Sequence, residues 1–260
     1  TMMMGFGCNA VGVTGCRIID SPRERWIAML TNAFVPCNGR FPMLLALLSV
    51  LFRDPSLAAV GFIACLALSG GVTLCVSRVL SDTVLRGCPS AFALELPPYR
   101  MPQIAKTIAR AVCDRILHVL GRAVAVAAPA GAVLWLMDTV RLGDASLLCH
   151  FIRFLDPLGA LFGMDGVILS GFVLALPAAE IFYPLVLDGY AACGIPFSGA
   201  ADWSTVTALC VLVFTLFHWP CATTLWTIRR ESGSTRMTLW AAALPTAIGF
   251  TLCWLISLWR

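Results

Sequence analysis

Long apolar runs that contain no charged residue constrain this chain more than any other feature. Residues 56–76 and 237–259 form two such runs, and each is long enough to cross a membrane as a helix, which takes about 20 residues. Only 12% of the 260 residues are charged, whereas soluble proteins average about 25%, so the chain lacks the polar side chains to cover a surface in water. The sequence therefore predicts an all-α, polytopic transmembrane helical bundle.

Other apolar segments are shorter or interrupted. Residues 120–137 and 204–217 are expected to be further spans, whereas residues 41–52 are short for a span. The run 166–187 is broken at 176–180, with the sequence LPAAE, because proline cannot continue a helix without losing a hydrogen bond. We therefore expect broken or re-entrant helices, and the sequence leaves open whether 41–52 and 166–187 cross the membrane.

Charged residues are distributed unevenly between the connections. The net charge is +4, and arginine supplies nearly all of the excess because Lys106 is the only lysine. Residues 78–122 and 218–236 are basic and are predicted to be cytoplasmic, whereas the acidic stretch 138–165 is predicted to lie outside. Membrane orientation thus explains the arginines, and we predict contact with membrane lipid and no nucleic-acid partner.

Two stretches interrupt an apolar segment next to a cysteine. Gly5–Arg25 contains Cys8, and His218–Glu231 contains Cys221; in both, a short apolar stretch, an arginine, an acid and a serine follow the cysteine. An irregular backbone at membrane depth is tolerated only where it is packed in protein or lines a cavity. Transporters commonly pair such repeats around a site at the membrane midplane. We interpret the two stretches as a degenerate internal repeat that handles an ion.

Several side chains in these stretches are candidate metal ligands. Thiols are soft ligands that suit Fe(II), Zn(II) or Cu(I), which makes Cys8 and Cys221 the first candidates. Asn9 directly follows Cys8. His218 lies on nearly the same face as Cys221 if the helix continues, and otherwise it is an interfacial residue beside Trp219.

Glu180 lies inside an apolar run, where a carboxylate is costly and by default marks an ion path. The alternatives are a helix cap and a structural pair with a buried arginine. Cys16 and Cys37 are further candidates, and most of the twelve cysteines are interpreted as small hydrophobes rather than as a disulfide framework. The sequence contains no phosphate-binding loop and no nucleophile–base–acid set, so it predicts no enzyme.

Four segments carry a resemblance to a known family. They read GFGCN at 5–9 with DSPRER at 20–25, ELPPYRMP at 95–102, GFV…PAAE at 171–180, and PCAT…IRRESGS at 220–234. In this order they resemble the first gate motif, the ELPPYR segment, the second-gate GF…E motif and the PC(V/A)T…RRE(T/S)GS motif of the FeoB ferrous iron transporters. Together they cover nearly the whole chain.

The resemblance implies a permease for Fe²⁺, with Cys8 and Cys221 as its two gate cysteines. Glu180 matches the family's second-gate motif. Our leading hypothesis makes Asn9, Glu180 and His218 supporting metal contacts, with Fe²⁺ as the transported ion and no tightly bound cofactor. Two departures stand out. The family's common GCNVPA reads GCNAVG here, so a proline is missing after Asn9, and LPAAE stands where many members have VAKE.

The resemblance also implies an organisation. Residues 1–40 would end the first gate domain, 41–122 would form a central segment with a cytoplasmic ELPPYR loop and an amphipathic helix, and 123–260 would form the second gate domain. FeoB proteins carry a GTP-binding domain ahead of this region. It is absent here, so we expect a fragment for which GTP acts only through the missing domain. We also predict a homo-oligomer in the cell (inner) membrane.

Three alternatives remain open from the sequence. The chain could be a non-transporting scaffold or remnant that binds a partner through its cytoplasmic loop. It could transport another divalent metal. It could also transport an organic solute such as a nucleoside, in which case replacing the thiols would leave no metal effect.

Overall fold

The computed structural model describes residues 1–52, 54–83, 101, 103–110, 112–113, 117–143 and 145–259. The ELPPYR segment lies outside the described residues, except for Met101 in its extension to Pro102. The amphipathic helix expected after it is described only in part, as α6 (Ile104–Arg110). The statements that follow concern the described ranges.

Helices make up nearly all of the described chain, which confirms the predicted all-α class. The remaining α-helices are α1 (Met2–Gly7), α2 (Asn9–Gly15), α3 (Pro22–Thr31), α4 (Phe41–Leu51), α5 (Pro55–Asp82), α7 (Leu117–Thr139), α8 (Leu147–Leu161), α9 (Gly166–Leu174), α10 (Phe182–Ala192), α11 (Thr205–Phe217), α12 (Ala222–Ser232) and α13 (Thr235–Ser257). Within the described ranges, the strands are β1 (Arg141–Leu142) and β2 (Ala145–Ser146), which pair antiparallel with Arg141 opposite Ser146.

Capping residues set the helix starts that matter for the fold. The Ser21 hydroxyl accepts the Glu24 N–H at 3.5 Å, and Pro22 takes the first position of α3, where its missing N–H costs nothing. Before α5, the Asp54 carboxylate accepts the N–H of Ser56 at 3.0 Å and its hydroxyl at 2.8 Å. These bonds favour the charged carboxylate and lower the pKa of Asp54.

In the part of the chain that the structure describes, four helical units are long and apolar enough to cross a membrane: Pro22–Leu51, Pro55–Asp82, Thr205–Ser232 and Thr235–Ser257. The short segment 41–52 is thus the second half of a broken unit that begins with α3. The pair α8 and α9 passes the same test but is bent by 109°. Broken helices were therefore predicted correctly.

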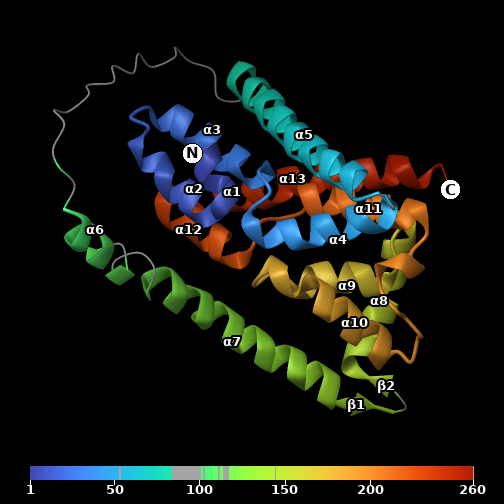
Figure 1. Ribbon diagram of the computed structural model, residues 1–260. Coiled ribbons are helices and arrows are strands. Elements are labelled where there is room, and N and C mark those ends of the chain that lie inside the picture. Colours follow the sequence, from blue (N-terminus) through green and yellow to red (C-terminus); the bar gives the residue numbers. More distant parts are fainter. Residues whose placement is uncertain are drawn as a thin grey trace.

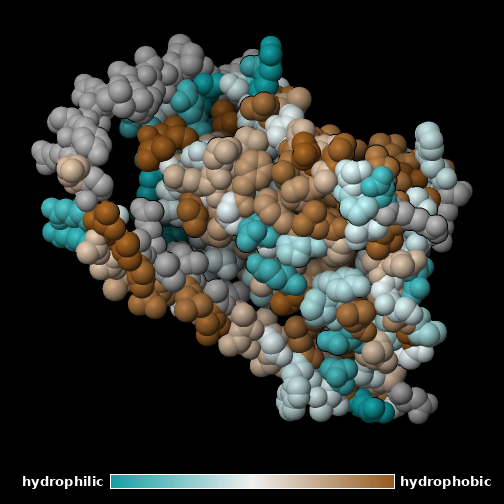
Figure 2. Space-filling view, viewed as in Figure 1, coloured by the Kyte–Doolittle hydropathy of each residue, from teal (hydrophilic) through white to brown (hydrophobic). Residues whose placement is uncertain are grey.

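The surface carries the apolar side chains that lipid requires. Along α5, large hydrophobic residues such as Val60, Ile63 and Leu74 are exposed, as are Trp254 near the end of α13 and Trp259 just after it. Figure 2 shows apolar side chains along α7 and across the face of α5, whereas hydrophilic ones gather toward the β1–β2 end. Exposed apolar patches of this extent mark a membrane-facing surface.

The helices form two buried cores. The larger core lies between α4, α8 to α11 and α13, and the smaller lies between α2, α3, α12 and α13. Figure 1 shows α2 and α12 together near the N-terminus, while α8, α9 and α10 stack beside the hairpin at the other end. The long helices α5 and α7 flank this body on opposite sides.

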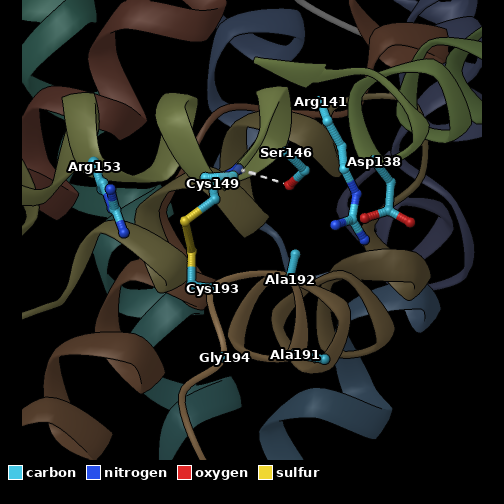
Figure 3. Close-up of a pocket in the computed structure, with 10 residues that line it drawn as sticks. Asp138, Arg141, Ser146, Cys149, Arg153, Ala191, Ala192, Cys193 and Gly194 are labelled. Atoms are coloured by element: carbon cyan, nitrogen blue, oxygen red, sulfur yellow. Dashed lines mark hydrogen bonds between the residues drawn. A yellow bond between two sulfur atoms is a disulfide. The ribbon is translucent and has the colours of Figure 1, made fainter. Parts of the chain in front are cut away.

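One structural feature was not predicted. Cys149 of α8 and Cys193 at the end of α10 form a disulfide, with Cα atoms 5.3 Å apart. The sequence analysis had singled out neither cysteine and had interpreted most of the twelve as small hydrophobes. The bond borders a hollow of about 400 Å³, in which Arg141 and Asp138 lie on one side of the disulfide and Arg153 on the other (Figure 3).

Candidate functional site

The first helix break lies at Cys8. This residue ends α1 and precedes α2 in an extended conformation, with φ −154° and ψ 124°. Its thiol is half-buried. The predicted helix–break–helix element is therefore confirmed, with the cysteine itself at the break.

The second break spans His218 to Cys221. Helix α11 ends at Phe217, and α12 begins at Ala222 with Cys221 as its extended N-cap residue. The Cys221 thiol is half-buried and lies 3.2 Å from the Thr224 hydroxyl. Both predicted gate cysteines thus occupy the position directly before the second half-helix of a broken unit.

The two second half-helices pack against each other. Helix α2 contacts α12, and Arg17 after α2 forms a salt bridge of 2.6 Å to Glu231 near the end of α12. The Glu231 carboxylate raises the pKa of Arg17. Burial raises the pKa of Cys16 to about 11, and its thiol donates to the Gly12 carbonyl at 3.4 Å, so Cys16 serves packing. The repeated stretches are neighbours in space as well as alike in sequence.

A buried arginine holds the second break in place. Arg40 is 2% exposed, and its guanidinium donates to the carbonyl oxygens of Leu216 (3.0 Å), His218 (3.3 Å) and Trp219 (3.1 Å). These carbonyls belong to the last turn of α11 and the break, where intrahelical donors have run out. Arg40 lies between two apolar segments of the sequence, and a charged residue in such a position often binds buried polar groups. Its partners were not predicted.

His218 turns back onto α11 rather than continuing toward Cys221. Its Nδ1 lies 3.0 Å from the Phe214 carbonyl oxygen and 3.1 Å from that of Thr215. Carbonyls only accept, so Nδ1 carries a proton and the neutral ring has its lone pair on Nε2. The ring also packs on Phe172 at 5.2 Å. Because α11 ends at Phe217, His218 and Cys221 do not share one helical face.

Glu180 lies at a third break, between α9 and α10. It is exposed, and a Cβ added to Gly39 would stand 2.5 Å from its Oε1, so the carboxylate rests on the Gly39 backbone. The Ala222 N–H donates to the Leu176 carbonyl at 2.7 Å. This bond ties the third break to the residue after Cys221.

A fourth break, at residues 35–39, completes the arrangement. It contains the half-buried Cys37, and its Gly39 lies against the Glu180 carboxylate of the third break. Arg40, the next residue, donates to the His218 and Trp219 carbonyls of the second break. The second, third and fourth breaks therefore meet around one buried guanidinium, and the first break joins them through the contact of α2 with α12.

The site is closed in this conformation. Arg40, Phe172, Thr215 and His218 line a cavity of only about 10 Å³, the lower limit for a single water molecule. Among the described residues, no group of three or more His, Cys, Asp or Glu side chains is placed to hold a metal ion. The hollow of about 400 Å³ lies elsewhere and is lined by Arg141, Arg153 and Asp138, a poor setting for a cation.

Asn9 and Asn32 add two buried amides beside Cys8. Each is 3% exposed, and the Asn32 Nδ2 donates to the Asn9 backbone carbonyl at 2.8 Å. Asn9 was a predicted site residue, whereas Asn32 was missed because it is distant in sequence from the first break.

Comparison with known proteins gives consistent matches over the chain. The family model described as "Ferrous iron transport protein B C terminus" matches residues 62–115, and the model "Gate", described as nucleoside recognition, matches residues 120–235. A Staphylococcus aureus protein named Fe(2+) transporter FeoB is 26% identical over 96% of this chain, which spans 39% of that protein. Its counterpart in Methanocaldococcus jannaschii is 23% identical over 99% of this chain, which spans 40% of it.

A third relative, from Synechocystis, also carries the name Fe(2+) transporter FeoB and is 26% identical over 98% of this chain, which spans 42% of it. No solved structure matches the chain. The chain thus spans about two fifths of the length of these curated relatives.

Proposed function

Because this chain belongs to the FeoB family through its membrane region, we propose that it forms the path by which Fe²⁺ crosses the membrane. The observation that carries the proposal is that four helix breaks pack against one another and that three of them hold a half-buried cysteine, namely Cys8, Cys37 and Cys221. Interrupted helices that meet in a packed core are the usual framework of a substrate site in transporters.

The proposed chemistry is transient ligation. Fe²⁺ accepts thiolate, imidazole and oxygen ligands, and conduction requires ligation weak enough to release the ion. Cys8 and Cys221 would contact the ion in passage, and the Nε2 atom of His218 would be an additional donor. Glu180, exposed beside Gly39, would attract the cation toward the thiols. Thiols spread over separate breaks give no permanent cage, which favours passage over storage.

Opening of the site is a required step in this proposal. The cavity between Arg40 and His218 holds about 10 Å³, so an ion passes only after α12 or α10 moves. We propose that a GTP-binding domain elsewhere in the full-length protein supplies this control, that GTP acts through that domain, and that the protein works as a homo-oligomer. No enzymatic role is assigned to the present chain.

We further propose that the protein is a multi-pass protein of the cell membrane, with its β1–β2 end outside. The Cys149–Cys193 disulfide supports this orientation, because disulfides persist in oxidising compartments. In intact cells, a membrane-impermeant thiol reagent of high mass should label these two cysteines only after reduction with an impermeant phosphine. Labelling without reduction would contradict the orientation or the bond.

The central test replaces the gate thiols. Cys8→Ser, Cys221→Ser and the double variant are produced in cells as this chain fused to the N-terminal region of a full-length relative, and ⁵⁵Fe²⁺ uptake is measured. We expect the double variant to lose most uptake while remaining in the membrane fraction. Cys75→Ser is the matched control, since Cys75 is an exposed thiol on α5, and its uptake should be unchanged.

The same experiment separates the competing functions. Normal Fe²⁺ uptake by the double variant would refute the site assignment. Cysteine-dependent uptake of Zn²⁺ or Mn²⁺ without uptake of Fe²⁺ would indicate that the protein transports another divalent metal. The description of one matching family model favours nucleoside transport as a second candidate, which predicts nucleoside flux that does not depend on Cys8 or Cys221. A scaffold would give no flux of either substrate.

A further inference from the structure

Two buried amide oxygens beside the first break have no hydrogen-bond donor. Among the described residues, the Oδ1 atoms of Asn9 and Asn32 are the buried side-chain oxygen or nitrogen atoms without a partner. Each residue is 3% exposed. The two are linked, because the Asn32 Nδ2 donates to the Asn9 carbonyl at 2.8 Å. Both orphaned oxygens therefore belong to one cluster next to Cys8.

The backbone is shaped to admit the Asn32 side chain. A Cβ added to Gly5 would lie 2.6 Å from the Asn32 Oδ1, and one added to Gly12 would lie 2.5 Å from it. Real Cβ atoms do not approach this closely, so a larger residue at either position would displace the Asn32 side chain. Gly5 is on α1 and Gly12 is on α2. The amide oxygen of Asn32 thus sits between the two halves of the broken helix.

The burial of two oxygens without donors lowers the stability of the fold, which indicates a functional reason for their presence. Each buried acceptor without a donor destabilises the folded protein, and an apolar side chain would leave no such acceptor. Buried polar groups without partners are rare in native proteins, and each calls for an explanation such as an ion or a functional role. Amide oxygens are donors for hard and borderline cations.

We propose that the side-chain oxygens of Asn9 and Asn32 form an oxygen-donor seat for a divalent cation, beside the Cys8 thiol. The inference rests on the proposed function and adds a residue, Asn32, to the ion path. Fe²⁺ accepts both oxygen and sulfur ligands, so it would exchange water for amide oxygens here and then meet the thiol. A soft ion such as Cd²⁺ would depend on the thiol and little on the amides.

Asn32→Leu tests the seat with a side chain of similar shape and no oxygen. The variant is produced in the same fusion and also purified, so that thermal unfolding and metal uptake are both measured. We expect the variant to fold and to lose Fe²⁺ and Mn²⁺ uptake by about tenfold or more, while thermal unfolding measures the effect of losing the Nδ2 bond to the Asn9 carbonyl. Cd²⁺ uptake should change far less. A residue needed only for packing would not separate hard from soft ions.

Controls make each outcome decisive. Gln103→Leu removes an exposed amide outside the four breaks and should leave all three uptakes unchanged. If Asn32→Leu does not fold, Asn32→Asp is used instead, because it keeps an oxygen and adds charge. It should lower the half-saturating Mn²⁺ concentration by about tenfold. Wild-type Fe²⁺, Mn²⁺ and Cd²⁺ uptake in Asn32→Leu, or an unchanged Mn²⁺ dependence in Asn32→Asp, would overturn the seat.

Failure of this inference is distinguishable from failure of the proposed function. If the Cys8→Ser, Cys221→Ser protein loses uptake while Asn32→Leu retains it, the thiol path stands and the oxygen seat is wrong. If the double cysteine variant transports Fe²⁺ normally, the thiol assignment itself is wrong, whatever Asn32→Leu does.

Discussion

At the break between α11 and α12, backbone carbonyls accept hydrogen bonds from buried side chains. At the break between α1 and α2, two buried side-chain oxygens have no hydrogen-bond donor. At the second break, Arg40 binds three carbonyls and His218 faces two more. At the first break, the Asn9 and Asn32 side-chain oxygens are buried and unpartnered. Both breaks nevertheless place a half-buried cysteine directly before the second half-helix.

The difference assigns different tasks to two similar elements. The fixed charge of Arg40 repels a cation from the carbonyls that it binds. The unpartnered amide oxygens of Asn9 and Asn32 keep their lone pairs free for a cation. We therefore call Arg40 and the three carbonyls that it binds a latch, which must open before an ion passes. The first break, with the Asn9 and Asn32 oxygens, is the proposed ion site. Three changes to single residues would break or sharpen this contrast.

The largest effect is expected from Arg40→Met, which removes the latch. The variant leaves the carbonyls of Leu216, His218 and Trp219 without their donor, and we expect a loss of about 3 kcal/mol or more in stability. Thermal unfolding in detergent, followed by tryptophan fluorescence, measures the change. Arg236→Met changes an exposed arginine and is the control. Equal unfolding temperatures for both variants would mean that Arg40 is no latch.

An intermediate effect is expected from Gly12→Ala at the first break. The new Cβ would meet the Asn32 Oδ1 at 2.5 Å, and overpacking of this kind costs about 1–3 kcal/mol. The same unfolding assay applies. Gly7→Ala is the matched control, because a Cβ at Gly7 meets nothing within 4 Å. If Gly12→Ala is as stable as Gly7→Ala, Asn32 does not occupy the slot between α1 and α2.

The smallest effect is expected from Arg17→Gln, which cuts the link between the two second half-helices. The Arg17 side chain is 64% exposed, and exposed salt bridges contribute about 0.2–1 kcal/mol. The loss should shrink further at high salt, because ions screen the pair. Measuring unfolding at two salt concentrations checks both points. A loss as large as that of Arg40→Met would show that α2 and α12 depend on this bridge.

The local features of the site were predictable from the sequence. Glycine and proline beside Cys8 and Cys221 indicated helix breaks, and the breaks are where they were expected. Ser21 and Pro22 marked the start of α3 correctly. These predictions succeeded because capping and helix breaking depend on residues within one or two turns of each other.

The partners across the molecule were not predictable in the same way. Arg40 donates to the Leu216 carbonyl, 176 residues away in sequence. Asn32 donates to the Asn9 carbonyl at the first break, 23 residues away. Cys149 and Cys193 pair across 44 residues, and nothing in the sequence around either cysteine indicated the other. Such contacts depend on how helices pack, which a single sequence does not encode locally.

The sequence by itself determined that the chain is a helical membrane protein, where its helices break and which thiols stand at the breaks. Hydropathy and chain stereochemistry act over a few residues, so they can be taken from sequence alone. Only the tertiary structure decided which break is held shut and which keeps free oxygens. That distinction depends on whether a distant donor reaches each buried acceptor, and packing alone brings Arg40 to one break and Asn32 to the other.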